Sequence, residues 1–147
     1  MSTGLFWFRN DLRVHDNPGL YHACSENNEI ILVYIIDEHF QDNYGNTQRW
    51  WLKESLKSLK KQLNEKKVFL NILQGTPKQI ISEIQKKYAV KNIYWNRRYE
   101  PQNIKLDSKI KSYFQKNNIN VQSYCSNLLL DPWKILNQNN ECYKVFT

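Results

Sequence analysis

The chain has 147 residues, which is enough for one domain with a core of its own. Its composition, 41% hydrophobic and 14% aromatic, excludes a disordered protein. The formal net charge of +7 comes mostly from scattered lysines, which predict solvated helix faces rather than a DNA-binding groove.

Cysteine and histidine usage excludes two further classes. The three cysteines are far apart and form no C-x-x-C, and the three histidines lack the i, i+4 spacing of a helical zinc site. We therefore expect neither a disulfide framework nor a metal. The chain also has no signal peptide and no apolar run of about 18 residues, so we expect a soluble, cytoplasmic protein without membrane contact.

Short apolar runs predict five strands, and none of them shows the clean alternation of a half-exposed sheet. Such runs are typical of strands that are covered on both faces, as in a mostly parallel sheet. The predicted strands are Leu5–Phe8, Ile30–Ile36, Val68–Leu73, Asn92–Trp95 and Ile119–Val121.

Amphipathic segments between these runs predict helices. Leucines at 52, 56, 59 and 63 form one apolar stripe on a helix from about Thr47 to Glu65, and similar stripes occur at 80–88 and 106–114. Asn17 is the expected N-cap of the first helix. The segment 76–79 predicts another helix start, with Thr76 as the cap, Pro77 at the first helical position and Gln79 completing a capping box.

The alternation of strands and helices predicts an α/β fold: a doubly wound, mostly parallel five-stranded sheet with helices on both faces, as in Rossmann-like domains. Ligands bind such sheets at the carboxyl ends of the strands, so the loops of interest are 9–16, 37–46, 74–77 and 96–102. The pattern changes after about residue 127. We expect an α/β domain over 1–127, with 128–147 beginning a linker to a domain beyond this chain.

The loop after the first predicted strand alternates arginine and aspartate. Arg9, Asp11, Arg13 and Asp16 could pair with one another and fix the loop. As a string, residues 7–18, W-F-R-N-D-L-R-x-x-D-N-P, resemble the opening signature of the photolyase/cryptochrome family. The resemblance continues in order, with the double tryptophan common in one bacterial branch, through the segments 33–37, 49–56, 74–77, 94–101 and 143–147.

The resemblance implies an antenna domain. Members of this family bind FAD in a C-terminal helical domain, absent here, and their N-terminal domain often holds a second, light-harvesting chromophore. The expected partners are therefore that helical domain and, through it, damaged DNA. We expect a monomer that repairs no DNA by itself. No catalytic residue is predicted, since the chain shows no nucleophile elbow and no paired carboxylates.

The position of residues at predicted strand ends supplies the chromophore-binding candidates. Arg9 and Asn10 could donate hydrogen bonds to ring carbonyls, and Trp51 could stack on a planar ring. The alternative is structural, with ion pairs among 97–100 and both tryptophans packed on the sheet. The full set is Arg9, Asn10, Asp37, Trp51, Asn96, Arg98, Glu100, Gln102 and Asn103.

The identity of the chromophore stays open between methenyltetrahydrofolate and 8-hydroxy-5-deazaflavin. Folate-binding relatives often carry Asn-Glu where this chain has Gln102-Asn103, and deazaflavin-binding relatives tend to have an acidic residue where Arg98 falls.

The function also has alternatives. We prefer the light-harvesting domain of a deoxyribodipyrimidine photolyase, a light-driven DNA repair lyase, because the string resembles the bacterial branch. A cryptochrome photoreceptor domain, or a fragment kept only as a scaffold, is the alternative. A nucleotide-binding module unrelated to light would need a phosphate loop, and neither G-x-G-x-x-G nor G-x-x-x-x-G-K-[ST] occurs.

Overall fold

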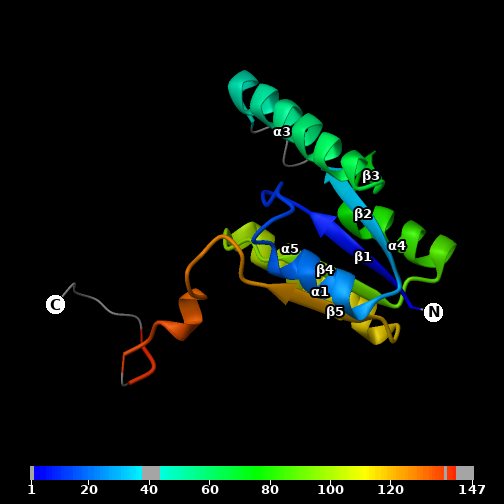
Figure 1. The fold of residues 1–147 in the computed structure, drawn as a ribbon. Coiled ribbons are helices and arrows are strands. Elements are labelled where there is room, and N and C mark those ends of the chain that lie inside the picture. Colours follow the sequence, from blue (N-terminus) through cyan, green and yellow to red (C-terminus); the bar gives the residue numbers. More distant parts are fainter. Residues whose placement is uncertain (1, 38–43, 138, 142–147) are drawn as a thin grey trace.

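The computed structural model describes residues 2–37, 44–137 and 139–141. Strands and helices alternate along the chain, as the apolar runs and stripes predict (Figure 1). The elements are β1 (Thr3–Phe8), α1 (Pro18–Glu26), β2 (Glu29–Ile36), α3 (Asn46–Glu65), β3 (Leu70–Gln74), α4 (Pro77–Tyr88), β4 (Asn92–Asn96), α5 (Pro101–Lys116), β5 (Asn120–Tyr124) and the 3₁₀ turn η1 (Pro132–Lys134).

The five strands form one sheet in the order β3-β2-β1-β4-β5, and every pair is parallel. The chain winds outward from β1 through β2 to β3, and then crosses back to β4 on the other side of β1. Strand order therefore reverses between β1 and β4. The predicted doubly wound α/β fold is confirmed.

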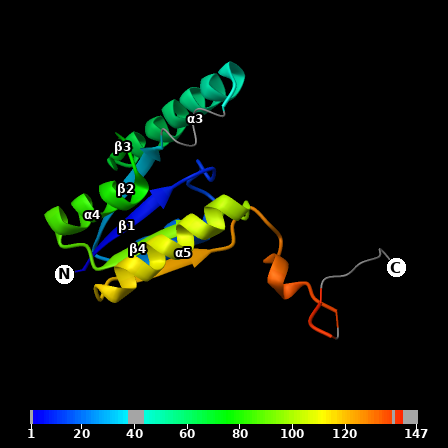
Figure 2. The ribbon, with the colours of Figure 1, turned by 180° about the vertical axis from the view of Figure 1, so that it is seen from behind.

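Helices cover both faces of the sheet. On one face, α1 and α3 pack on a core that includes Phe6, Phe8 and Tyr94. On the other face, α4 and α5 cover a core that includes Trp7 and Trp95 (Figures 1 and 2). The central strands β1 and β4 are buried on both faces, which explains why their sequences do not alternate.

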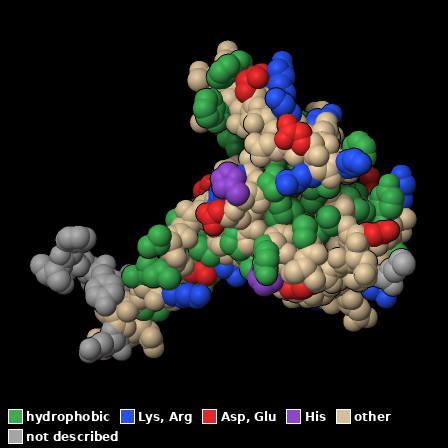
Figure 3. Space-filling model, in the orientation of Figure 1, with side chains coloured by type: hydrophobic (Ala, Val, Ile, Leu, Met, Phe, Trp, Pro, Cys, Tyr) green, Lys and Arg blue, Asp and Glu red, His purple; other side chains and the backbone are tan. Residues whose placement is uncertain are grey.

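The long helix α3 confirms the predicted leucine stripe, since Leu56, Leu59 and Leu63 are buried against the sheet. Its first two turns, residues 46–51, are exposed on every side. The helix therefore projects past the sheet, with its first turns farthest from it (Figure 1). The space-filling view shows hydrophobic side chains on the surface between α3 and α1 (Figure 3).

Two helix starts test the predicted caps. Asn17 caps α1 as expected, because its Oδ1 accepts a hydrogen bond from the backbone N–H of Leu20 at 3.1 Å. The predicted capping box at Thr76 is wrong. Thr76 occupies the N-cap position of α4 but makes no side-chain cap hydrogen bond, and its backbone carbonyl accepts from the N–H of Ile80. The preset backbone angle of Pro77 supports this start.

The segment after β5 leaves the sheet and carries exposed apolar side chains, among them Leu129 and Trp133 (Figures 2 and 3). Asp131 anchors this segment to the chain after β4. Its carboxylate accepts hydrogen bonds from Arg97 Nη1 at 3.1 Å and from the Tyr99 hydroxyl at 2.6 Å. The domain boundary near residue 127 stays a prediction, and the motif at 143–147 lies outside the described residues. No described helix is long and apolar enough to cross a membrane.

Candidate functional site

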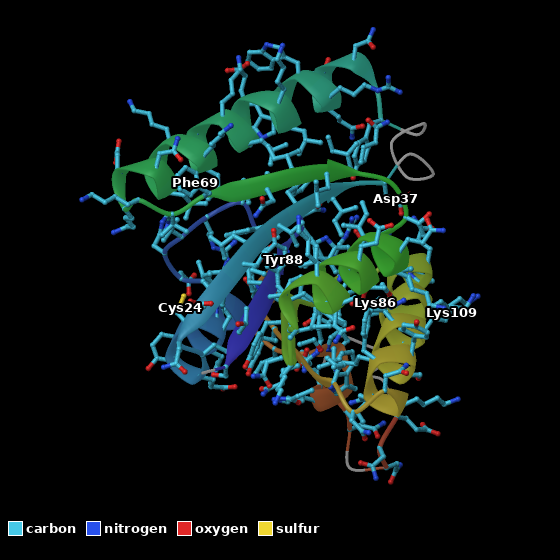
Figure 4. The ribbon with its side chains drawn as sticks, turned by 90° about the vertical axis from the view of Figure 1, so that its right-hand side faces the viewer. Cys24, Asp37, Phe69, Lys86, Tyr88 and Lys109 are labelled. Atoms are coloured by element: carbon cyan, nitrogen blue, oxygen red, sulfur yellow. The ribbon has the colours of Figure 1, made fainter. Side chains whose placement is uncertain are left out.

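The parallel topology brings the carboxyl ends of all five strands to one edge of the sheet. Arg9 directly follows β1, and Asp37 directly follows β2, where Figure 4 labels it. Arg98 follows β4. Since β1 and β4 flank the point of strand-order reversal, this is the edge at which doubly wound sheets bind ligands.

A cleft opens at this edge, between the β1 loop and the first turns of α3. It has a volume of about 690 Å³. A small hollow of about 50 Å³ adjoins it over the ends of β1 and β2 and shares four lining residues with it: Arg9, Asn10, Tyr34 and Tyr44. We call the two together the carboxyl-edge cleft. Its other polar or aromatic lining residues are Trp7, Phe8, Arg13, Asp37, Thr47, Gln48, Trp51, Ser55, Arg98 and Asn103.

Arg9 lies at the base of the cleft with only 5% of its surface exposed. Its Nη1 lies 2.8 Å from Oδ2 of Asp107 on α5, and its guanidinium lies 4.7 Å from the centre of the Trp7 ring. Burial lowers the pKa of Arg9 and raises that of Asp107, and their mutual attraction only partly offsets this. The ion pair with Asp107 fixes the Arg9 guanidinium where the larger cleft and the small hollow meet.

The expected pairing within the loop 9–16 is wrong. No ion pair joins these four side chains in the described loop. Arg13 Nε donates to the backbone carbonyl of Asp16 at 3.0 Å, and the other side-chain partners of the two arginines come from distant parts of the chain. Arg13 Nη2 donates to the backbone carbonyl of Ser126 at 3.0 Å, and the Asp11 carboxylate accepts from the backbone N–H of Arg9 at 2.8 Å.

Asn96 does not line the cleft. It is 1% exposed, and its Oδ1 accepts from the backbone N–H of Gly19 at 3.0 Å. Its Nδ2 donates to the carboxylate of Asp11 and to Oδ1 of Asn17. The amide thereby joins the end of β4 to the beginning of α1. A side chain at position 19 would meet this amide, since a Cβ there would lie 2.7 Å from Asn96 Oδ1.

The segment after β4 forms the other wall of the small hollow. Arg98 Nη2 donates to Glu100 Oε1 at 2.9 Å, and this bond lowers the pKa of Glu100. Glu100 in turn accepts from Asn103 Nδ2 at 3.2 Å. Nε of Arg98 is buried and has no hydrogen-bond partner among the described residues. Gln102 is exposed and lines neither hollow.

Of the two tryptophans, only Trp51 lines the cleft, although both are exposed. The structural alternative that they pack on the sheet is therefore wrong. Trp51 is 66% exposed and stands on the first turns of α3 above Arg9 and Asn10. A planar ring entering the cleft would find this indole on one side and hydrogen-bond donors on the other.

Several residues of the site were not among the sequence candidates, and Tyr34, Tyr44 and Asp107 show why. Tyr34 lies near the end of β2, among residues that are aliphatic after Glu29, and burial raises the pKa of its hydroxyl to about 12, so it stays a neutral donor. The polar hydroxyl of Tyr34 among aliphatic neighbours is the feature of the sequence that could have marked it as a site residue. Tyr44 precedes α3 without any pattern of its own. Asp107 lies in mid-helix, 98 residues from Arg9, and no local spacing connects the two.

The side chains of the carboxyl-edge cleft are suited to binding a polar ligand. Among the described residues, the lining combines one exposed indole, two tyrosines and several arginine and amide donors. Such a set can hold and orient a planar, polar molecule.

Comparison with known proteins identifies the family. A family model described as DNA photolyase matches residues 4–147. The chain belongs to the DNA photolyase family. The resemblance noted in the sequence is therefore confirmed.

Relatives include both functional classes of the family. The deoxyribodipyrimidine photo-lyase of Agrobacterium fabrum is 30% identical over 97% of this chain and 30% of the relative. Cryptochrome-2 of Arabidopsis thaliana is 31% identical over 97% of this chain and 24% of the relative. The chain thus spans less than a third of the length of these relatives.

Two solved structures share the fold. A bacterial class III photolyase from Agrobacterium tumefaciens superposes with a TM-score of 0.91 at 28% identity, over 99% of this chain and 30% of that one. An archaeal photolyase from Sulfolobus tokodaii, described as holding two FAD molecules and implying a novel light-harvesting cofactor, has a TM-score of 0.76 at 32% identity. That match covers 88% of this chain and 31% of the other.

Proposed function

We propose that this chain is the light-harvesting, pigment-binding domain of a deoxyribodipyrimidine photolyase. The whole protein would bind catalytic FAD in a helical domain beyond this chain and act on pyrimidine dimers in DNA. Membership of the DNA photolyase family supports this proposal, and so does the likeness to the Agrobacterium photolyase. A cryptochrome photoreceptor is the second candidate, favoured by the comparable likeness to Cryptochrome-2.

The carboxyl-edge cleft is the observation that carries the pigment-binding role. Its larger part has a volume of about 690 Å³, which lies within the roughly 300–1,000 Å³ that is typical of small-molecule sites. The donors that would orient a pigment are fixed in advance: Arg9 by Asp107 and Arg98 by Glu100. Burial raises the pKa of Tyr34 and so keeps its hydroxyl protonated. Pre-organised donors reduce the ordering needed when a ligand binds.

The residues present fit a pigment with ring carbonyls or an anionic group. Arg9, Arg13 and Arg98 all border the cleft, and Asp37 is the acidic lining residue within the described part. A reduced folate and a deazaflavin, the two pigments expected from the sequence, both offer such groups. A flavin is a third candidate pigment, because the Sulfolobus photolyase is described with two FAD molecules and a novel light-harvesting cofactor. When bound, the pigment would supply light absorption, while these side chains bind and orient it.

The predicted partners follow from the same proposal. The segment after β5 carries exposed apolar side chains, such as Leu129. These side chains are suited to contact with the helical FAD domain that we propose for the whole protein, whose relatives are longer than this chain. DNA would be bound through that domain, since the lysines of this chain are scattered along its sequence.

Pigment retention by the chain tests the proposed function. The purified chain is incubated separately with methenyltetrahydrofolate, 8-hydroxy-5-deazaflavin and FAD, and then passed through gel filtration. We expect one of these pigments to elute with the protein, with its near-UV or blue absorption band shifted by the cleft. An absence of any co-eluting band with all three, under conditions in which circular dichroism shows the folded chain, would contradict a self-sufficient pigment site.

A further inference from the structure

The segment after β5 is attached to the domain through a buried carboxylate. Within residues 126–137 and 139–141, Asp131 alone is buried, with 4% of its surface exposed, although this stretch contains Leu129, Leu130 and Trp133. An aspartate is rarely buried unless it is paired, and apolar side chains are ordinarily buried before it. The segment therefore depends on a charged contact for its position.

Two residues that follow β4 hold this carboxylate. Arg97 Nη1 donates to both carboxylate oxygens of Asp131 at 3.1 Å, and the Tyr99 hydroxyl donates to Oδ1 at 2.6 Å. The same two side chains contact Trp133 of the segment. The Arg97 guanidinium lies 5.6 Å from the centre of the indole, and the Tyr99 ring lies 5.8 Å from it. We call Arg97, Tyr99 and Asp131 the Asp131 anchor.

The residue between the two anchor residues belongs to the carboxyl-edge cleft. Arg98 lines the cleft, whereas Arg97 and Tyr99 do not. Residues 97–99 lie between the end of β4 and the beginning of α5, outside any helix or strand. Their position therefore depends on side-chain contacts, and the contacts of Arg97 and Tyr99 fix the backbone on both sides of Arg98.

The two sides of Arg98 depend on Asp131 to different degrees. On one side, the backbone N–H of Arg97 donates to the carbonyl of Tyr124 on β5 at 2.8 Å, and this bond does not involve the segment after β5. On the other side, the Tyr99 hydroxyl donates to Asp131 itself. Loss of the carboxylate would therefore release the Tyr99 side of Arg98 and leave the Arg97 side in place.

We propose that Asp131 is a positioning residue that couples the carboxyl-edge cleft to the segment after β5. The proposal rests on the pigment-binding function of the cleft. While the anchor is closed, Arg98 is held in place before a pigment enters, so less ordering accompanies binding. Coupling between two sites is reciprocal, so a pigment bound beside Arg98 stabilises the closed anchor in turn. The bound pigment thereby also fixes the direction in which the chain leaves the domain.

Amide hydrogen exchange of the 147-residue chain without pigment is the first test. Asp131→Ala should speed exchange by about fivefold or more in residues 128–135 and also in residues 97–104, which do not contain the substitution. Leu129→Ala changes an exposed side chain of the same segment and should leave exchange in 97–104 at the wild-type rate. Circular dichroism confirms that each variant is folded. Wild-type exchange of 97–104 in Asp131→Ala would overturn the proposal.

Pigment titration gives the second test, with whichever of methenyltetrahydrofolate, 8-hydroxy-5-deazaflavin and FAD the wild type retains. Asp131→Ala and the milder Tyr99→Phe should raise the pigment dissociation constant by about fivefold or more, although neither residue lines the cleft. In the reverse direction, the pigment should slow exchange of residues 128–135 in the wild type and have no such effect in Asp131→Ala.

Two outcomes of the titration contradict the coupling: wild-type affinity in both variants, or exchange of residues 128–135 in the wild type that does not respond to the pigment. A wild type that retains none of the three pigments contradicts the proposed function instead. Exchange of residues 97–104 in Asp131→Ala then decides whether the anchor and the wall of the cleft are coupled, because that comparison needs no pigment.

Discussion

Replacing Arg9 with methionine should lower the free energy of unfolding by about 3–5 kcal/mol. The variant leaves the carboxylate of Asp107 buried without its cation, while Oδ2 keeps only the hydrogen bond from Trp95 Nε1 at 3.0 Å. An uncompensated buried charge is costly even where the intact ion pair adds little. Urea unfolding followed by circular dichroism measures the loss.

Two controls separate the buried pair from general effects. Lys57→Met breaks the exposed pair with Glu54 and should cost less than about 1 kcal/mol. Arg9→Met combined with Asp107→Asn removes both charges but keeps an acceptor for Trp95, so it should recover most of the lost stability. Equal losses in the single and double variants would show that Arg9 stabilises the fold by packing rather than by its charge.

Asn96→Ala should lower the free energy of unfolding by about 3 kcal/mol, because several buried polar groups lose their partner at once. The backbone N–H of Gly19 loses its acceptor, and Asp11 and Asn17 each lose a donor. Asn117→Ala is the matched control, since that amide bonds only to the carbonyl of Tyr113 on an exposed helix end. The control should change stability by less than about 0.5 kcal/mol.

The effect of Asn96→Ala on pigment binding distinguishes its two interpretations. From the sequence, Asn96 is a candidate ligand residue; in the structure it ties β4 to α1 and lies outside the lining of the cleft. We therefore expect pigment affinity to be nearly unchanged at temperatures where the variant is folded. A large loss of affinity without a loss of stability would return Asn96 to the binding site.

The fold could be predicted because its signals are local. Apolar runs without alternation predict the parallel strands, and the leucine stripe predicts α3 nearly to its ends. The strand β3 was placed two residues early, at Val68 instead of Leu70, because Val68 and Phe69 are apolar yet precede the ladder. The cap at Thr76 failed because residue type alone does not fix where a hydroxyl points.

The candidate site could be predicted only in part. Topology places every strand end at one edge, so Arg9, Asn10 and Asp37 were found from their position alone. The pairing of Arg9 with Asp107 depends on how α5 packs under the sheet, which no local spacing encodes. The same limit applies to the contact of Arg13 with Ser126, which lies 113 residues farther along the chain.

The most direct test of the pigment site compares Trp51→Ala with Trp50→Ala in an equilibrium titration with the retained pigment, followed by its absorption band. The two tryptophans are neighbours on α3 with similar exposure, but only Trp51 lines the carboxyl-edge cleft. We predict that Trp51→Ala weakens binding by about tenfold or more, through loss of ring stacking, while Trp50→Ala binds like the wild type. Equal affinities for the wild type and both variants would contradict pigment binding in this cleft.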